Sequence, residues 1–188
     1  SGPVGVEGTQ DWLAAIGDAC GIAAEKVAAA QNAMLGACRG ALAQSPIKGR
    51  ITLSGYEGSE LLVARLLVES GADLRYVGTA CPRTPFAEID AAWLEARGVA
   101  VRFRASLEQD CAAMEAFEPD LAIGTTPVVQ KAKERGIPAL YFTNLISARP
   151  LMGPAGAGSI AEVVNGAMAS KPRFDAMKAF FASEGAAA

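Results

Sequence analysis

Between residues 51 and 144 the sequence repeats one pattern, in which a short apolar run is followed by an amphipathic segment. The apolar runs are rich in β-branched and aromatic residues, as strands are. The segments between them carry apolar residues at spacings of three and four, as helices do. Strands that alternate with helices pair in parallel through right-handed crossovers. The repeat therefore predicts a doubly wound (Rossmann-like) α/β fold, with a parallel five-stranded sheet and helices on both faces.

The limits of the expected elements follow from glycines and prolines that interrupt the repeat. We expect strands at 51–55, 74–79, 99–104, 120–125 and 139–144. The expected helices are 59–70, 86–97, 107–117, 127–135, 158–170 and 173–183.

The residues before the first strand are predicted to be helical. Thr9 or Asp11 can cap a first helix, and a longer helix begins at about Ala23. Its apolar face is expected to comprise Val27, Ala30, Met34, Cys38 and Leu42. Because Ser45-Pro46 stops this helix, we expect a helical segment at 1–46 and a Rossmann-like α/β domain at 47–188.

Charge and hydropathy exclude several classes of protein. The net charge is −3 with no block of like charges, so we expect no nucleic-acid partner. No apolar run reaches the length of a transmembrane segment, and no signal peptide is visible. The chain opens with Ser1-Gly2 instead of Met, which we interpret as the remnant of a tag on a piece of a longer protein.

Histidine is absent, which removes the commonest general base and metal ligand. The four cysteines, Cys20, Cys38, Cys81 and Cys111, form no C-x-x-C pair, so we expect no metal site. Cys38 and Cys111 fall in expected helices and are interpreted as small buried hydrophobic residues in a reducing compartment.

The turn after the first expected strand, in "LSGYEGSELL", has two readings. Its glycines, Gly55 and Gly58, are spaced neither as G-x-G-x-x-G nor as a P-loop. The helix that follows could still attract an anion at its first N–H groups. We favour the simpler reading, in which glycine permits a tight turn and Ser59 caps the helix.

Polar loops follow the strands, at the edge where doubly wound sheets bind ligands. "GTACPRTPF" holds Cys81 and Arg83, and "GTTP" holds Thr125. Cys81 has no histidine partner, so we expect it to line a site or serve as a lone ligand, and not to act as a nucleophile. "NLISARPLMGPAGAGS" is read either as a ligand surface or as a long connecting loop.

Three stretches together carry a family resemblance. "PVGVEGTQDWL", "KGRITLSGYEGSELLVARLLVESGADLRYVGT" and "EPDLAIGTTPVVQKAKERGIPALYFTN" resemble the carboxyl-terminal part of the nitrogenase component 1-type oxidoreductases. The resemblance covers nearly the whole chain. Within the family, "TNLISARPLMGPAGAGS" most resembles a nitrogenase-like branch that acts in bacteriochlorophyll biosynthesis and photosynthesis.

The resemblance implies an oxidoreductase subunit fragment that is inactive alone. The full complex would carry out the ATP-dependent two-electron reduction of a chlorin ring double bond in chlorophyllide a. Its implied partners are a Z-type sister subunit and an ATP-dependent iron–sulfur reductase. The implied iron–sulfur cluster would have its ligands outside this chain. The implied location is the bacterial cytoplasm, and peripheral association with photosynthetic membranes is allowed.

The resemblance also bears on the site. Nitrogenase proper places a cofactor-binding histidine near Thr143-Asn144, and with no histidine in the chain a nitrogenase-type metal cofactor is excluded while an organic substrate fits. A chlorin needs backbone close to its face, which Gly55 and the run 153–158 would allow. Its propionate needs a cation, Arg83 or Arg149. The expected substrate-binding residues are Tyr56, Cys81, Arg83, Thr125, Asn144 and Arg149, and no catalytic residue is assigned.

Two other functions remain open. The first is a non-enzymatic tetrapyrrole or metal-chelate binding module of related fold. The second is the sugar-nucleotide-binding half of a glycosyltransferase, which needs an acid or a cation for phosphates at the strand ends. Only Arg83, Arg149 and Glu57 could serve there.

Overall fold

A sheet of five parallel strands lies at the centre of the molecule. The computed structural model describes residues 2–147 and 149–185. The strand order is β3-β2-β1-β4-β5, so the chain moves outward from β1 in one direction and then in the other. The strands are β1 (Arg50–Gly55), β2 (Asp73–Thr79), β3 (Ala100–Phe103), β4 (Leu121–Gly124) and β5 (Ala139–Tyr141). The predicted doubly wound α/β fold is confirmed.

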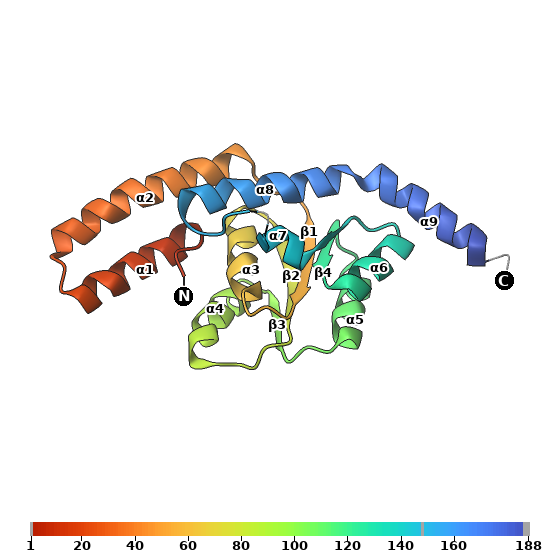
Figure 1. The fold of residues 1–188 in the computed structure, drawn as a ribbon, viewed down its shortest axis with the longest axis horizontal. Coiled ribbons are helices and arrows are strands. Elements are labelled where there is room, and N and C mark those ends of the chain that lie inside the picture. Colours follow the sequence, from red (N-terminus) through yellow and green to blue (C-terminus); the bar gives the residue numbers. More distant parts are fainter. Residues whose placement is uncertain (1, 148, 186–188) are drawn as a thin grey trace.

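Helices cover both faces of this sheet. Figure 1 shows α3 (Glu60–Glu69) and α4 (Pro85–Glu95) on one side of it, and α5 (Leu107–Phe117) and α6 (Thr126–Glu134) on the other. The last two helices are α8 (Gly153–Ala169) and α9 (Lys171–Gly185), and α9 continues from the end of α8 (Figure 1). No helix in the described ranges has the length and apolar composition needed to cross a bilayer.

Apolar side chains from the central strands form the main core. Full burial of one aliphatic side chain contributes about 1.5–3 kcal/mol, so a few strand residues in this core account for much of the stability of the sheet. The strand residues that are almost wholly buried here are Ile51, Leu53, Val77, Leu121 and Ile123. A smaller cluster, which includes Met114 and Val128, lies under α5 and α6.

Two helices precede the sheet, as predicted. α1 (Gly5–Cys20) and α2 (Ala24–Gln44) form a hairpin that projects beyond the sheet on the side opposite α9 (Figure 1). α2 packs on both α1 and α8. Its buried residues are Leu35, Cys38 and Leu42, whereas Met34, expected on this face, is 36% exposed. Whether the helical segment and the α/β part divide at residue 46 stays a prediction.

The start of α1 differs from the expected one, because its cap comes from another helix. The helix begins at Gly5, so neither Thr9 nor Asp11 is the cap. The Glu69 carboxylate of α3 accepts hydrogen bonds from the N–H groups of Val6 and Glu7. The Thr9 hydroxyl is buried and donates to the Gly5 carbonyl at 2.6 Å. A capping group 63 residues away along the chain cannot be read from local sequence.

Residues 142–147 and 153–159 are helical, contrary to the expected strand to residue 144 and the loop to 159. β5 stops at Tyr141 and α7 (Phe142–Ser147) begins at once, because Phe142 turns into the core. The expected glycine- and alanine-rich loop at 153–158 instead forms the first turns of α8. Pro154 suits this place, since proline fits the first turn of a helix.

Two glycines of α8 give a matched pair for a stability test. A Cβ on Gly156 would lie 2.2 Å from the Leu151 carbonyl carbon, so Gly156→Ala should lower the free energy of unfolding by about 1–3 kcal/mol. A Cβ on Gly166 would meet nothing within 4 Å, and Gly166→Ala should raise this free energy by about 0.5–1 kcal/mol. Urea unfolding followed by circular dichroism measures both. If Gly156→Ala raised the free energy of unfolding as much as Gly166→Ala, the start of α8 would not pack against Leu151 as described.

Candidate functional site

The candidate site lies at the carboxyl ends of the strands, beside the topological switch point. β1 pairs with both β2 and β4, and the chain leaves β1 and β4 in opposite directions across the sheet. Doubly wound sheets bind ligands in the crevice that opens at such a point. The turn after β1 lies at this place, and so does Thr125, which follows β4 at the N-cap position of α6.

The turn after β1 is filled by a side chain of the protein itself. Glu60, at the start of α3, is only 1% exposed. Its carboxylate accepts hydrogen bonds from the N–H groups of Glu57 at 2.6 Å and Gly58 at 3.0 Å. The Thr79 hydroxyl donates to it at 2.9 Å. Ser59 is the N-cap residue of α3, as predicted, but its side chain makes no capping hydrogen bond, and Glu60 accepts from the N–H groups of the turn.

Tyr56 and Cys81 come together across two loops. The Cys81 thiol lies 3.9 Å from the Tyr56 carbonyl oxygen, and the Cys81 N–H donates to the Thr79 hydroxyl at 3.2 Å. The Tyr56 side chain is 59% exposed and Cys81 is partly exposed. The thiol thus faces a carbonyl oxygen, and the lining role of Cys81 stays a prediction.

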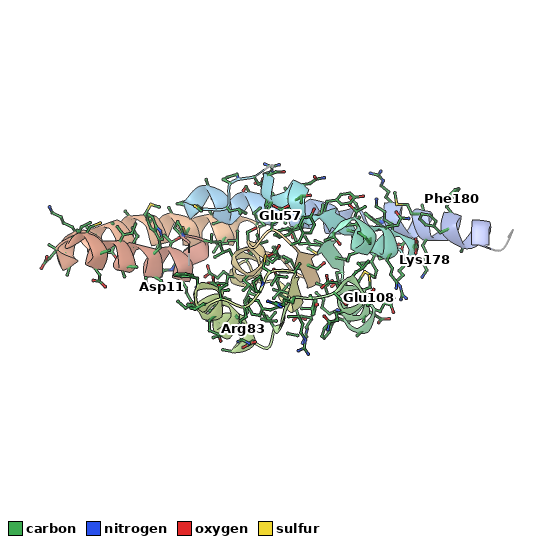
Figure 2. The ribbon with its side chains drawn as sticks, turned by 60° about the horizontal axis from the view of Figure 1, so that its bottom comes forward. Asp11, Glu57, Arg83, Glu108, Lys178 and Phe180 are labelled. Atoms are coloured by element: carbon green, nitrogen blue, oxygen red, sulfur yellow. The ribbon has the colours of Figure 1, made fainter. Side chains whose placement is uncertain are left out.

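Arg83 is engaged with a carboxylate in the first turn of α4. Its Nε and one terminal nitrogen both donate to Glu88, the latter at 2.7 Å. This pairing raises the pKa of Arg83 and lowers the pKa of Glu88. In Figure 2, Arg83 lies beside α4, apart from Glu57 in the turn after β1. A propionate at Arg83 would have to compete with Glu88, so its predicted role is disfavoured by the geometry.

Asn144 and Arg149 line one small cavity, of about 140 Å³, together with residues of β5 and α8. Both side chains are exposed. Among the residues that the structure describes, no ion pair involves Arg149, so its guanidinium is available for an anionic ligand. Since β4 lies between β1 and β5, Thr125 stands between this pair and the Tyr56–Cys81 pair.

An apolar surface at the same edge was not anticipated. Phe86, in the first turn of α4, is 81% exposed and lines a cavity of about 270 Å³ with Gly58 and Leu62. Met152, before α8, is 58% exposed. We call Tyr56, Leu62, Phe86 and Met152 the apolar rim. Phe86 could have been suspected, since it follows Pro85 in a loop already expected to reach this edge.

The glycines expected to admit a flat ligand have another role. A Cβ on Gly55 would meet the Glu60 carboxylate at 2.5 Å and the Phe142 ring at 2.9 Å. A Cβ on Gly158 would contact Ala41 of α2 at 3.6 Å. These glycines therefore allow close packing inside the chain, and the expectation that they face a ligand is wrong. The apolar rim takes their place as the surface that suits a flat ring.

The remaining cysteines lie away from this edge. Cys38 and Cys111 are buried, as predicted, and Cys20 is exposed at the end of α1. Burial raises the pKa of the Cys38 and Cys111 thiols, which keeps them protonated and unreactive. Within residues 2–147 and 149–185, no three Cys, Asp, Glu or His side chains gather as a metal-ligand set.

A larger hollow, of about 620 Å³, opens at the other end of the strands. It lies between the N-terminal helices and the turn before β2, and is lined by Glu7, Arg39, Pro46, Glu69 and Gly71 among others. The carboxyl edge remains the better candidate site, because the strand ends of a doubly wound sheet converge only there.

Comparison with known proteins gives the class of protein. The sequence profile of the nitrogenase component 1 type oxidoreductases matches residues 1–169. The chain therefore belongs to the nitrogenase component 1 type oxidoreductases, and the resemblance drawn from its motifs is confirmed.

Two curated relatives, both named chlorophyllide reductase 52.5 kDa chain, are much more similar. The relative from Cereibacter sphaeroides is 72% identical over 185 residues, which are 98% of this chain and 37% of the relative. The relative from Rhodobacter capsulatus is 70% identical over 185 residues, with the same shares. The chain thus spans about 37% of the length of these relatives.

A solved structure supports the fold alone. "Nitrogenase Cp1 at pH 6.5" superposes with a TM-score of 0.64 at 21% identity, over 90% of this chain and 39% of that one.

Proposed function

We propose that this chain is the carboxyl-terminal part of a catalytic subunit, the Y subunit, of a nitrogenase-like chlorophyllide a reductase. The observation that carries the proposal is 72% identity to a chlorophyllide reductase chain over 98% of this chain. The activity proposed for the whole enzyme is the ATP-dependent two-electron reduction of a chlorin ring double bond. The proposed partners are a Z-type sister subunit and an ATP-dependent iron–sulfur reductase, in the bacterial cytoplasm.

Within that enzyme, this chain would bind and orient the pigment. The apolar rim offers the exposed side chains of Tyr56, Phe86 and Met152 and the half-buried Leu62 to a flat ring. Arg149, beside Asn144, would hold a propionate through charge-assisted hydrogen bonds. The described residues do not assemble a cluster-ligand set, so we assign no electron-transfer step to this chain. Its contribution would be shape, charge and exclusion of water.

The two rival functions are less well supported. A sugar-nucleotide site would need a phosphate at the strand ends, and the Glu60 carboxylate occupies the turn that would hold one. A stand-alone tetrapyrrole or metal-chelate module would bind pigment tightly in isolation. Absorbance titration of the isolated chain with chlorophyllide and with haem separates that function from ours, since a wall of a larger pocket should bind both weakly.

Arg149→Ala and Asn144→Ala test the pigment contact in the full complex. We expect Arg149→Ala to weaken chlorophyllide binding by about 1.5–3 kcal/mol, the range for hydrogen bonds to charged groups. Asn144→Ala should weaken it less, since a neutral hydrogen bond contributes about 0.5–1.5 kcal/mol. Absorbance titration measures the affinity, and gel filtration and iron content check assembly.

Arg83→Ala is the matched control, because Glu88 already engages Arg83. It should leave the pigment affinity within about twofold, well below the loss of one charged hydrogen bond. If the Arg149 and Asn144 variants bind pigment like the parent but fail to assemble, this surface contacts another subunit and the binding role is wrong.

A further inference from the structure

We propose that Glu60 is a resident anion that closes the turn after β1 to phosphorylated ligands and holds the loops after β1 and β2 together as one wall of the site. Glu60 is thus a positioning residue for Tyr56 and Cys81. The inference rests on the location of the candidate site, goes beyond the proposed function, and requires no particular pigment.

The first argument is the set of donors around the carboxylate. Two backbone N–H groups, of Glu57 and Gly58, and the Thr79 hydroxyl all donate to Glu60. Successive backbone N–H groups in a turn just before a helix form the kind of concavity in which nucleotide-binding folds hold phosphate. The Glu60 carboxylate takes that place. Gly55 makes the room, since any Cβ there would overlap the carboxylate at 2.5 Å.

The second argument is charge. Glu60 is 1% exposed, and no ion pair of the described residues includes it. Its charge is therefore balanced by N–H and O–H dipoles and by the start of α3. A phosphate would need these same donors and would be repelled by the carboxylate. The turn therefore selects against nucleotides and other phosphate esters, while neutral rings remain acceptable.

The third argument is connectivity. The Thr79 hydroxyl donates to Glu60 and accepts from the Cys81 N–H at 3.2 Å, so one carboxylate is linked to the loop after β2. The Cys81 carbonyl in turn accepts from the Arg104 N–H in the loop after β3 at 3.2 Å. The Cys81 thiol also contacts the Tyr56 carbonyl. Loss of the carboxylate should loosen the first two loops together without disturbing the core.

The cysteines provide a local readout that a general loss of stability would not mimic. In a Cys20→Ser background, Cys81 is the partly exposed thiol, and the buried Cys38 and Cys111 report global opening. In Glu60→Ala we expect Cys81 to react with an aromatic disulfide reagent at least about tenfold faster, as a more populated local opening requires. Cys38 and Cys111 should stay protected.

The matched control is Glu69→Ala, at the other end of α3. Glu69 also accepts backbone hydrogen bonds, but from the start of α1. It should leave the Cys81 rate unchanged. If Glu60→Ala exposes Cys38 and Cys111 as well, the Cys81 rate is measured in Glu60→Gln instead, because glutamine keeps the side-chain volume and removes the charge. The proposal would be overturned if the Cys81 rate were unchanged in a Glu60 variant in which Cys38 and Cys111 stay protected.

Added anions test the resident-anion role directly. Formate should restore slow Cys81 reaction in Glu60→Ala, and inorganic phosphate should raise the thermal stability of that variant, whereas chloride at equal ionic strength should do neither. The parent chain should respond to none of the three. Failure of formate, or phosphate binding at the same turn in the parent, would overturn the proposal. Since no pigment is used, the result stands apart from the proposed function.

Discussion

Replacing Asp90 by alanine is expected to lower the free energy of unfolding by about 3–5 kcal/mol, as when one partner of a buried ion pair is removed. Asp90 of α4 pairs with Arg65 of α3 at 2.6 Å, and the two side chains are 7% and 2% exposed. The Arg65 guanidinium also lies 4.8 Å from the Trp93 ring centroid. Without the Asp90 carboxylate, a buried cation loses its ion-pair partner. Urea unfolding gives the free energy without adding salt.

The control is the exposed pair of Arg75 and Asp73, separated by a similar 2.8 Å, with side chains about half exposed. Asp73→Ala should cost less than about 1 kcal/mol, because solvent screens surface pairs. The two substitutions remove the same chemical group, so their difference isolates burial. Similar losses for both would mean that water reaches Arg65 and that α3 and α4 are not packed as described.

A second large effect is expected at Phe142. This side chain is 2% exposed, belongs to the main core and lies directly under Gly55. Phe142→Ala should cost about 3–5 kcal/mol, from lost burial and the cavity left behind. It should also free α7, which carries Asn144, and so weaken the site as a secondary effect. Chemical unfolding of the variant and parent measures the main effect.

Phe86→Ala is the contrasting substitution. Phe86 is 81% exposed, so its removal should change stability by no more than about 0.5 kcal/mol. If the apolar rim contacts pigment, the same variant should reduce the chlorophyllide affinity of the full complex. The pair thus separates support of the fold from contact with the ligand. A large stability loss in Phe86→Ala would show that the rim is covered by the chain itself.

The sheet was predictable because the local sequence pattern indicates each strand and helix. The glycines that end helices illustrate this: Gly71, Gly98 and Gly136 all have positive φ, at the places where the repeat required a break. The parallel pairing followed from the alternation of strands and helices alone. The limits of β5 were harder, because Phe142 continues an apolar run in sequence yet begins a helix in space.

The place of the six candidate residues in the fold was predictable, and their partners were less so. All six candidate residues lie after strand ends, because a parallel sheet brings those ends to one edge. The structure groups Tyr56 with Cys81 and Asn144 with Arg149. It turns Arg83 toward Glu88, a carboxylate only five residues away that the sequence did offer. Glu60 was missed because one of its donors, Thr79, lies at the end of another strand, β2.

The strand order also constrains how the chain can fold. β1 is central, yet its neighbour β4 enters the chain only after β2, β3 and the three helices α3, α4 and α5 have been made. During synthesis one edge of β1 therefore stays unpaired until β4 is made. α2 likewise lacks its contact with α8, which comes near the end of the chain. Such non-local pairing slows folding and leaves apolar surface open to aggregation. Release from the ribosome before α8 has emerged should therefore yield an aggregation-prone chain, in which order of synthesis limits the yield.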